Sequence, residues 1–145
     1  GQIIGKLREI LEGRADVRVV GDRFVFQSEV LFGAGEAAIS PEGQGELAKL
    51  ADAIKELEAQ IPADVNWVLR IDGHTDKRPI NTPEFPSNWE LSAARSIAVT
   101  KYLVAAGVSA QHLVAAGFGD SRPIDAGETE EAYARNRRIE FKLTE

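Results

Sequence analysis

Residues 65–72 read Val-Asn-Trp-Val-Leu-Arg-Ile-Asp, with an apolar side chain at every second position. A period of two is the pattern of a β-strand with one face more buried than the other. Gly73 ends this predicted strand, and a loop rich in proline follows. Ser87 and Glu90 then form a Ser-x-x-Glu capping box, which predicts a helix to about Ala106. This strand–loop–helix unit is the centre of the predicted fold.

Further helices and strands are predicted around this unit. Gly21-Asp22 suits a primed hairpin turn because its glycine can take a positive φ. Ser40 supplies an N-cap oxygen, and Pro41 suits the first helical position. The other predicted elements are a short amphipathic helix over 3–11 that Gly13 stops, a hairpin of 17–20 and 23–26, a helix from 41 to before 62, a strand over 113–118, a short helix, and a strand over 139–143. This order favours helices packed on one face of a mixed sheet, with the charged residues of the last strand on its outer face.

The composition is that of an ordinary soluble globular domain. The 145 residues match a single domain, given roughly 150 residues per domain. The formal net charge of −6 argues against a nucleic-acid binder and against a polybasic membrane-surface module, since both depend on an excess of cations. The sequence contains no cysteine, which excludes disulfide scaffolds, thiolate zinc sites and cysteine nucleophiles.

Arg95 is the residue that points most directly to a functional site. On a helical wheel it lies about 40° from Leu91, on the apolar side of its helix. Burial of a guanidinium without a partner is costly, so a carboxylate from the protein or from a ligand must lie nearby. Asp76 is the best internal candidate because it follows the predicted strand. Two interpretations stay open: a structural ion pair, or a receptor in which Asp76 takes an ammonium and Arg95 takes a carboxylate.

Other polar motifs give weaker indications. His74 and His112 do not fit a paired-ligand motif, so no metal is predicted. No nucleophile elbow and no Ser-x-x-Lys motif occurs, so neither an enzymatic activity nor a cofactor is predicted. Gly33–Ala38 mimics a dinucleotide-binding turn, but Glu36 would face the pyrophosphate, and a flexible turn explains the segment better. Arg135–Arg138 is a small basic cluster, which is more typical of a solvated strand start than of a phosphate site.

Four segments of the chain resemble the OmpA-like peptidoglycan-binding domain, the module shared by OmpA, the lipoprotein Pal and the flagellar stator protein MotB. In the order in which the family has them, these segments are Gly73–Asp76, Asn88–Arg95, Gly117–Ile124 and Asn136–Glu140. The resemblance covers about Val17 to the C-terminus. It implies an α/β (α+β) fold with a mixed β-sheet, helices packed mainly on one face, and a β-α-β-α-β-β arrangement.

The resemblance also implies a ligand site. In the family, the aspartate of the Thr-Asp pair and the arginine of Leu-Ser-x-x-Arg hold the diaminopimelate of the peptidoglycan stem peptide, and these positions are Asp76 and Arg95 here. Diaminopimelate suits the receptor interpretation because it offers an ammonium and a carboxylate. The other residues that the resemblance places around the pocket are Thr75, Leu91, Phe32 and the block from Asn136 to Arg138. A period of two puts Asn136 and Arg138 on one strand face, so Arg138 is preferred to Arg137.

Within the family, the chain is most similar to the MotB type. The stretch between Asp76 and Arg95 is longer than in the OmpA and Pal type, and residues 78–80 and 85–89 resemble MotB. Tyr133 departs from the pattern because it stands where the family often has an arginine. By this likeness, residues 1–14 are expected to form a membrane-proximal linker helix, and residues 15–145 the peptidoglycan-binding domain.

The function implied by the resemblance is non-catalytic anchoring. The domain is expected to be periplasmic, to bind peptidoglycan, and to be tethered to a membrane through an N-terminal anchor that this sequence lacks. No nucleic-acid partner is expected, and a homodimer is compatible with this role. The alternative is a periplasmic protein–protein or dimerisation module with a vestigial pocket, in which residues 3–11 and the proline-bearing loop make the contacts.

Overall fold

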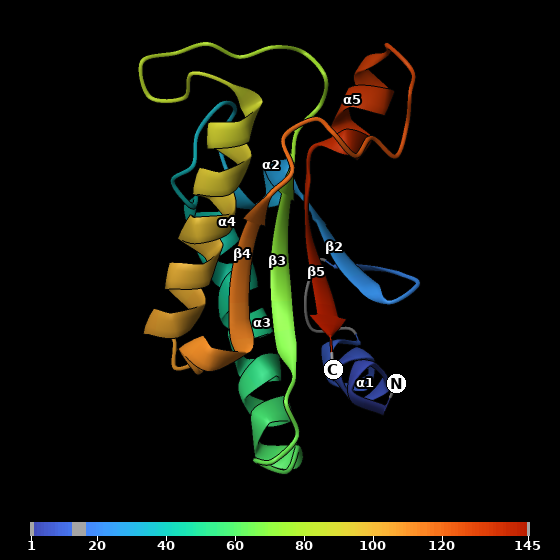
Figure 1. The fold of residues 1–145 in the computed structure, drawn as a ribbon, viewed down its shortest axis with the longest axis vertical. Coiled ribbons are helices and arrows are strands. Elements are labelled where there is room, and N and C mark those ends of the chain that lie inside the picture. The colour runs from blue at the N-terminus through green and yellow to red at the C-terminus, as the bar shows by residue number, and fades with distance from the viewer. Residues whose placement is uncertain (1, 13–16, 145) are drawn as a thin grey trace.

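The computed structural model describes residues 2–12 and 17–144, with a five-stranded sheet at the centre (Figure 1). The strands are β1 (Arg18–Val20), β2 (Arg23–Gln27), β3 (Val68–His74), β4 (Leu113–Gly117) and β5 (Arg138–Thr144). The helices are α1 (Gln2–Leu11), α2 (Ser28–Leu31), α3 (Pro41–Gln60), α4 (Asn88–Ala105), the short 3₁₀ helix η1 (Ala110–His112) and α5 (Glu130–Asn136). The predicted hairpin, long helices, short C-terminal helix and closing strand are confirmed, whereas Gly13 lies outside the described residues.

The sheet is mixed, as the sequence predicts. Its strand order is β1-β2-β5-β3-β4. Strand β3 pairs in parallel with β4 through the α4 crossover, and in antiparallel fashion with β5. The β1–β2 hairpin extends the sheet through β2, which pairs antiparallel with β5. The last strand in the sequence therefore lies in the middle of the sheet, between the two halves of the domain.

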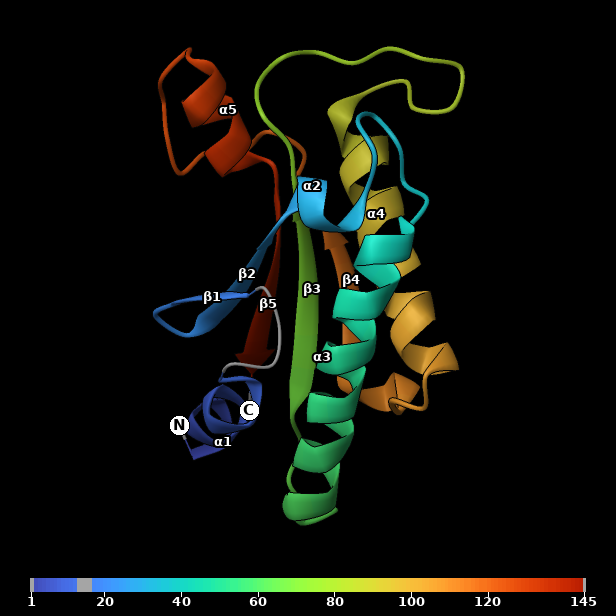
Figure 2. The same cartoon turned by 180° about the vertical axis from the view of Figure 1, so that it is seen from behind.

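Helices α3 and α4 lie side by side on one face of the sheet (Figure 2). Ser40 caps α3 by accepting a hydrogen bond from the Gly43 backbone N–H at 3.0 Å, and Pro41 occupies its first turn. The apolar side of α3 is buried in one core with the inner faces of β2, β3 and β5. Helix α1 contacts α3, and its buried residues belong to this same core. The proposed boundary between residues 14 and 15 falls outside the described residues and stays a prediction.

Two glycines allow α4 to lie unusually close to the sheet. A Cβ atom on Gly73 would lie 2.3 Å from the Ser92 backbone oxygen and 2.7 Å from Ser96 Oγ. A Cβ atom on Gly117 would lie 2.7 Å from the Ala93 backbone nitrogen. Glycine is needed wherever one backbone approaches another this closely. The two glycines thereby set the distance between α4 and strands β3 and β4. They also set how far the side chains of α4 lie from these strands.

Three local features differ from the sequence prediction. Strand β3 runs over Val68–His74 instead of 65–72, because its pairing with β5 continues to the His74–Arg138 pair. Helix α2 was not predicted, since four residues are too few to show a helical period. Arg138 and Glu140 do lie on the face away from the core, but they are buried instead of solvated. These two side chains are shielded from solvent because they bond to each other, and Glu140 also bonds to Arg23 on the same face.

Candidate functional site

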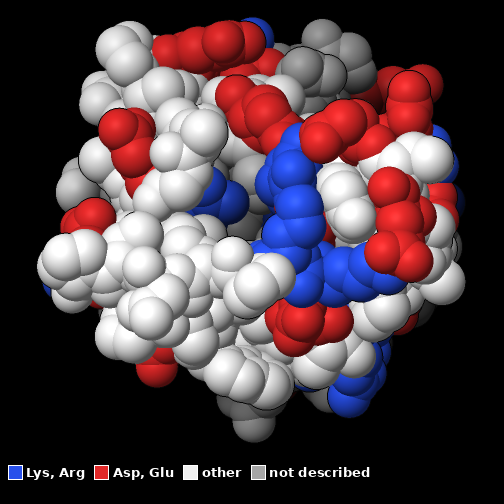
Figure 3. Space-filling view, turned by 90° about the horizontal axis from the view of Figure 1, so that it is seen from above, with Lys and Arg blue, Asp and Glu red and all other residues white. Residues whose placement is uncertain are grey.

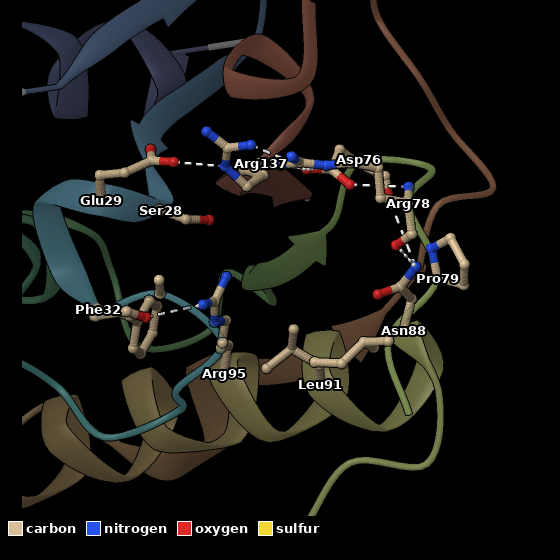
Figure 4. A pocket seen from close by; sticks show the side chains of 14 residues that line it. Ser28, Glu29, Phe32, Asp76, Arg78, Pro79, Asn88, Leu91, Arg95 and Arg137 are labelled. Atoms are coloured by element: carbon tan, nitrogen blue, oxygen red, sulfur yellow. Dashed lines mark hydrogen bonds and ion pairs between the residues drawn. The ribbon is translucent and has the colours of Figure 1, made fainter. Parts of the chain in front are cut away.

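A cavity of about 450 Å³ opens at the end of the sheet where β3 stops. Four parts of the chain meet there: α2, the loop after β3, the first turns of α4 and the end of α5 (Figures 1 and 4). The lining side chains that carry charge or define the walls are Glu29, Phe32, Asp76, Leu91, Arg95 and Arg137, with Arg78 at the loop. Of the predicted site residues, the structure thus brings together Phe32, Asp76, Leu91 and Arg95.

Asp76 lies two residues beyond β3 and is only 6% exposed. Its Oδ2 accepts hydrogen bonds from Arg78 Nη2 at 2.8 Å and from Arg137 Nη1 at 2.9 Å. Its Oδ1 accepts one from the Arg78 backbone N–H at 2.9 Å. Burial raises the pKa of Asp76, but the hydrogen bonds from Arg78 and Arg137 outweigh it and hold the pKa below its usual value. Asp76 is therefore a carboxylate at neutral pH.

Arg95 reaches the cavity from α4 and is 5% exposed. Its Nε donates to the Glu36 backbone oxygen at 2.8 Å and its Nη2 to the Gly33 backbone oxygen at 3.2 Å. Its guanidinium carbon lies 5.0 Å from the centre of the Phe32 ring. Burial lowers the pKa of Arg95 to about 10, although the charges of Glu29 and Glu36 oppose the shift, and the group is still protonated at neutral pH.

The ion pair between Asp76 and Arg95 that the sequence suggests is not formed among the described residues. Each group has other partners: Asp76 pairs with Arg78 and Arg137, and Arg95 bonds to main-chain carbonyls. The interpretation of Arg95 as one half of a structural ion pair with Asp76 is therefore wrong. What remains is a buried cation at the wall of the cavity that forms no ion pair with a carboxylate of residues 2–12 and 17–144 (Figure 4).

The structure reverses the preference for Arg138 over Arg137. Arg137 lines the cavity. Its Nε donates to Glu29 Oε1 of α2 at 2.5 Å, and its Nη1 donates to Asp76. Arg138 does not line the cavity. It is 2% exposed and bonds to Glu140 on the face of the sheet away from the core. The reason is that α5 continues through Asn136 and Arg137 is its C-cap, so a strand period of two does not extend back through the block.

Thr75 and Asn136 do not line the cavity. The Thr75 hydroxyl donates to the Asp76 backbone oxygen at 2.9 Å, and the Thr75 backbone N–H bonds to the Gly119 oxygen. The Asn136 side chain accepts from the backbone N–H groups of Ile124 and Asp125. Thr75 therefore holds the loop that carries Asp76, whereas Asn136 holds the segment of Ile124 and Asp125, which does not line the cavity.

Arg78 lines the cavity and belongs to a segment that resembles MotB, but the sequence did not identify it as a site residue. Its guanidinium carbon lies 4.5 Å from the centre of the Tyr133 ring, so Tyr133 holds the arginine that caps Asp76. Tyr133, which stands where the family often has an arginine, therefore contacts Arg78 of the long loop. The lining side chains include three arginines and only two carboxylates in a chain of net charge −6. Figure 3 shows basic side chains gathered around a hollow at this end of the molecule.

A second buried polar cluster lies behind the site, on the sheet face away from the core. Asp72, His74 and Glu140 place one ligand atom each within 4.8 Å of one another. Both carboxylates are already occupied: Arg70 binds Asp72, while Arg23 and Arg138 bind Glu140. A divalent cation would have to share these oxygens with three guanidinium groups, so the cluster is better described as an arginine–carboxylate network than as a metal centre.

His74 makes this network sensitive to acid. It is 4% exposed and stacks on Phe118 at a centroid distance of 4.9 Å, and among the described residues neither ring nitrogen has a hydrogen-bond partner. Burial, aided by the nearby charge of Arg138, lowers the pKa of His74 to about 4. The unfolded chain, with a histidine pKa near 6.5, binds the extra proton first, so folding stability falls as the pH drops from about 6.5 to about 4.

We expect His74 to reduce the free energy of unfolding by up to about 3 kcal/mol across that range. The His74→Phe variant keeps a ring against Phe118 but cannot take up a proton, so its stability should fall much less. Urea unfolding of both proteins at pH 6.5 and pH 4 measures the difference, and the carboxylates that titrate in both proteins cancel in the comparison. An equal loss of stability in the two proteins would contradict the assignment.

The model of the OmpA family matches residues 31–137. The peptidoglycan-binding protein ArfA of Mycobacterium tuberculosis is 35% identical over 77% of this chain, which covers 31% of ArfA. The chain spans about a third to a half of the length of the curated relatives it matches.

Solved structures show the same fold. A putative MotB-like protein from Desulfovibrio vulgaris superposes with a TM-score of 0.80 and 30% identity, covering 98% of this chain and 88% of that one. The cell wall anchor of the type VI secretion system from Pseudomonas aeruginosa gives a TM-score of 0.76 and 32% identity, covering 95% of both chains. None of the helices in residues 2–12 and 17–144 has the length and apolar character needed to cross a bilayer.

Proposed function

Since the chain belongs to the OmpA family, we propose that its cavity binds peptidoglycan through the diaminopimelate of the stem peptide, without catalysis. The observation that carries this proposal is the buried Arg95, which lines the cavity and forms no ion pair within the described part of the chain. Two similar proteins support the same class of ligand, because ArfA is named as a peptidoglycan-binding protein and the Pseudomonas protein is a cell wall anchor.

A ligand carboxylate would complete the surroundings of Arg95. A guanidinium has five N–H donors, and two of its nitrogens bond to the oxygens of Glu36 and Gly33. The remaining donors can bind a carboxylate in charge-assisted hydrogen bonds, which are stronger than neutral ones. A carboxylate there would also supply the charge that offsets the desolvation of the guanidinium.

An ammonium group of the ligand would use Asp76. The Oδ2 atom is fully engaged by Arg78 and Arg137, but within residues 2–12 and 17–144 Oδ1 accepts a single hydrogen bond, from the Arg78 backbone. A carboxylate oxygen has two lone pairs, so Oδ1 can accept another donor without displacing either arginine. Leu91 and Phe32 offer apolar contact for the methylene chain between the two ends of diaminopimelate.

The wider role that follows is that of an anchor. We propose that the domain acts in the periplasm and fastens an envelope protein or a stator-type protein to the wall, tethered in full length to a membrane. A single site of this kind gives modest affinity, in the micromolar to millimolar range. Many such sites along one polymer still hold firmly.

The alternative role, a dimerisation module, is less well supported by the packing. The apolar residues of α1 that would form such a contact are already buried against α3 and the core; they are Ile3, Leu7, Ile10 and Leu11. A homodimer formed by other surfaces remains compatible with the anchoring proposal.

We expect the domain to sediment with purified sacculi whose stem peptides contain diaminopimelate, and to sediment at least about ten times less with sacculi that contain lysine. Lysine lacks the carboxylate at the far end of the side chain, so Arg95 would stay without its partner, and a lost charged contact is worth at least about 1.4 kcal/mol. Sedimentation across a series of protein concentrations measures the affinity for each of the two kinds of sacculi. Equal binding to the two walls would refute the diaminopimelate assignment, and binding to neither would refute the anchoring function.

A further inference from the structure

A second, shallower depression of about 200 Å³ lies at the first turn of α4. It shares Pro79, Ile80 and Asn88 with the cavity described above, so the two hollows are neighbours. The shared residues form the divide between a deep charged cavity and an open shelf. A ligand in the cavity that extends past these shared residues reaches the shelf.

Trp89 is the dominant side chain of the shelf. It is 55% exposed, whereas the other tryptophan of the chain, Trp67, is 3% exposed in the core. The indole packs on Gly119, where a Cβ atom would lie 3.2 Å from Trp89 Cδ2. Gly119 has a φ of +59°, so glycine suits both its conformation and its closeness to the ring. A large aromatic surface is thereby supported from one side and left open to solvent.

The rim of the shelf is polar and carries both donors and acceptors. Asn88 uses its amide nitrogen to bind the Arg78 backbone oxygen, which leaves the side-chain oxygen as an acceptor. Asp120 is exposed and takes part in no ion pair among the described residues. Lys77 contributes an ammonium that is 3.7 Å from Glu128 and about half exposed. An aromatic face bordered by such groups matches a ligand with an apolar ring face and hydroxyl or amide groups at its edge.

We propose, on the basis of the proposed function, that this shelf binds an N-acetylated amino sugar of the glycan strand, stacked on Trp89. The stem peptide is covalently joined to such a sugar, so a peptide held in the cavity brings its glycan to the neighbouring surface. The C–H face of the sugar packs on the indole, while Asn88, Asp120 and Lys77 bond to its amide and hydroxyl groups. The cavity and the shelf together bind a disaccharide-peptide as one ligand.

The test compares a diaminopimelate-containing stem peptide with the same peptide attached to its disaccharide. By isothermal titration calorimetry, the wild-type domain should bind the disaccharide-peptide about five to ten times more tightly than the peptide alone. Trp89→Ala should bind both ligands equally, with unchanged affinity for the peptide, and Trp89→Phe should keep most of the preference. Ile97→Ala serves as the matched control, because Ile97 is an apolar residue of the same helix that is 45% exposed and does not line the shelf.

A second measurement separates this inference from the proposed function. Since Trp67 is buried, acrylamide quenching reports mainly on Trp89, and the free disaccharide at millimolar concentration should protect the fluorescence. Protection without peptide binding would support the shelf and refute the diaminopimelate site. Equal affinity of the wild type for both ligands, or no protection by either sugar-containing ligand, would overturn the shelf and leave the peptide site standing.

Discussion

The Arg95→Ala variant is expected to lose its binding to diaminopimelate-type sacculi while it still unfolds cooperatively. Removing one partner of a buried charged contact typically costs 2–5 kcal/mol, or at least about 30-fold in affinity. The effect on folding should be smaller, because Arg95 bonds to two backbone oxygens of the 33–36 turn and to no carboxylate of the protein. Co-sedimentation measures the binding, and circular dichroism on heating measures the folding.

Two companion variants make this result specific. Asp76→Asn keeps the shape of the side chain but removes the charge that would bind an ammonium, so it should also lose binding. Arg135→Ala removes an exposed arginine that pairs with Asp125 outside the cavity, so it should bind as the wild type does. If Arg95→Ala still sediments normally, or if Arg135→Ala is equally defective, the cavity is not the wall-binding site.

The sequence was sufficient to locate the parts of the site that follow from local patterns. The helical period placed Leu91 and Arg95 on one side of α4, and the strand that precedes Asp76 brought that carboxylate to the same end of the sheet. The buried position of Arg95 was expected for the same reason, because a residue on the apolar stripe of a helix faces the core. Phe32 came from the family resemblance alone.

The partners of these residues could not be predicted in the same way. Arg137 is 61 residues from Asp76 in sequence, and α2, which supplies Glu29, is too short for a period to reveal it. The choice between Arg137 and Arg138 depends on the residue at which α5 ends and β5 begins. Periodicity is weakest at such boundaries, and an error of one residue moves a side chain to the opposite face of a strand.

Gly73→Ala is expected to be the most destabilising small substitution at the site. The new Cβ atom would meet the Ser92 backbone oxygen at 2.3 Å, and a backbone atom of a buried helix cannot rotate away as a side chain can. Overpacking of this kind costs about 3 kcal/mol, which corresponds to a fall of about 10 °C in Tm for a domain of this size. Thermal unfolding followed by circular dichroism measures it.

The same substitution should weaken wall binding even at temperatures where the variant is folded. To relieve the contact, α4 has to move away from β3, and it carries Leu91 and Arg95 with it, whereas Asp76 stays with the loop after β3. Gly45→Ala is the matched control: Gly45 is exposed in α3 and a Cβ atom there would meet nothing within 4 Å, so alanine should stabilise the helix by about 0.5–1 kcal/mol. An unchanged Tm and unchanged sedimentation of Gly73→Ala would show that α4 does not depend on this close approach, and that the distance between Arg95 and Asp76 is set elsewhere.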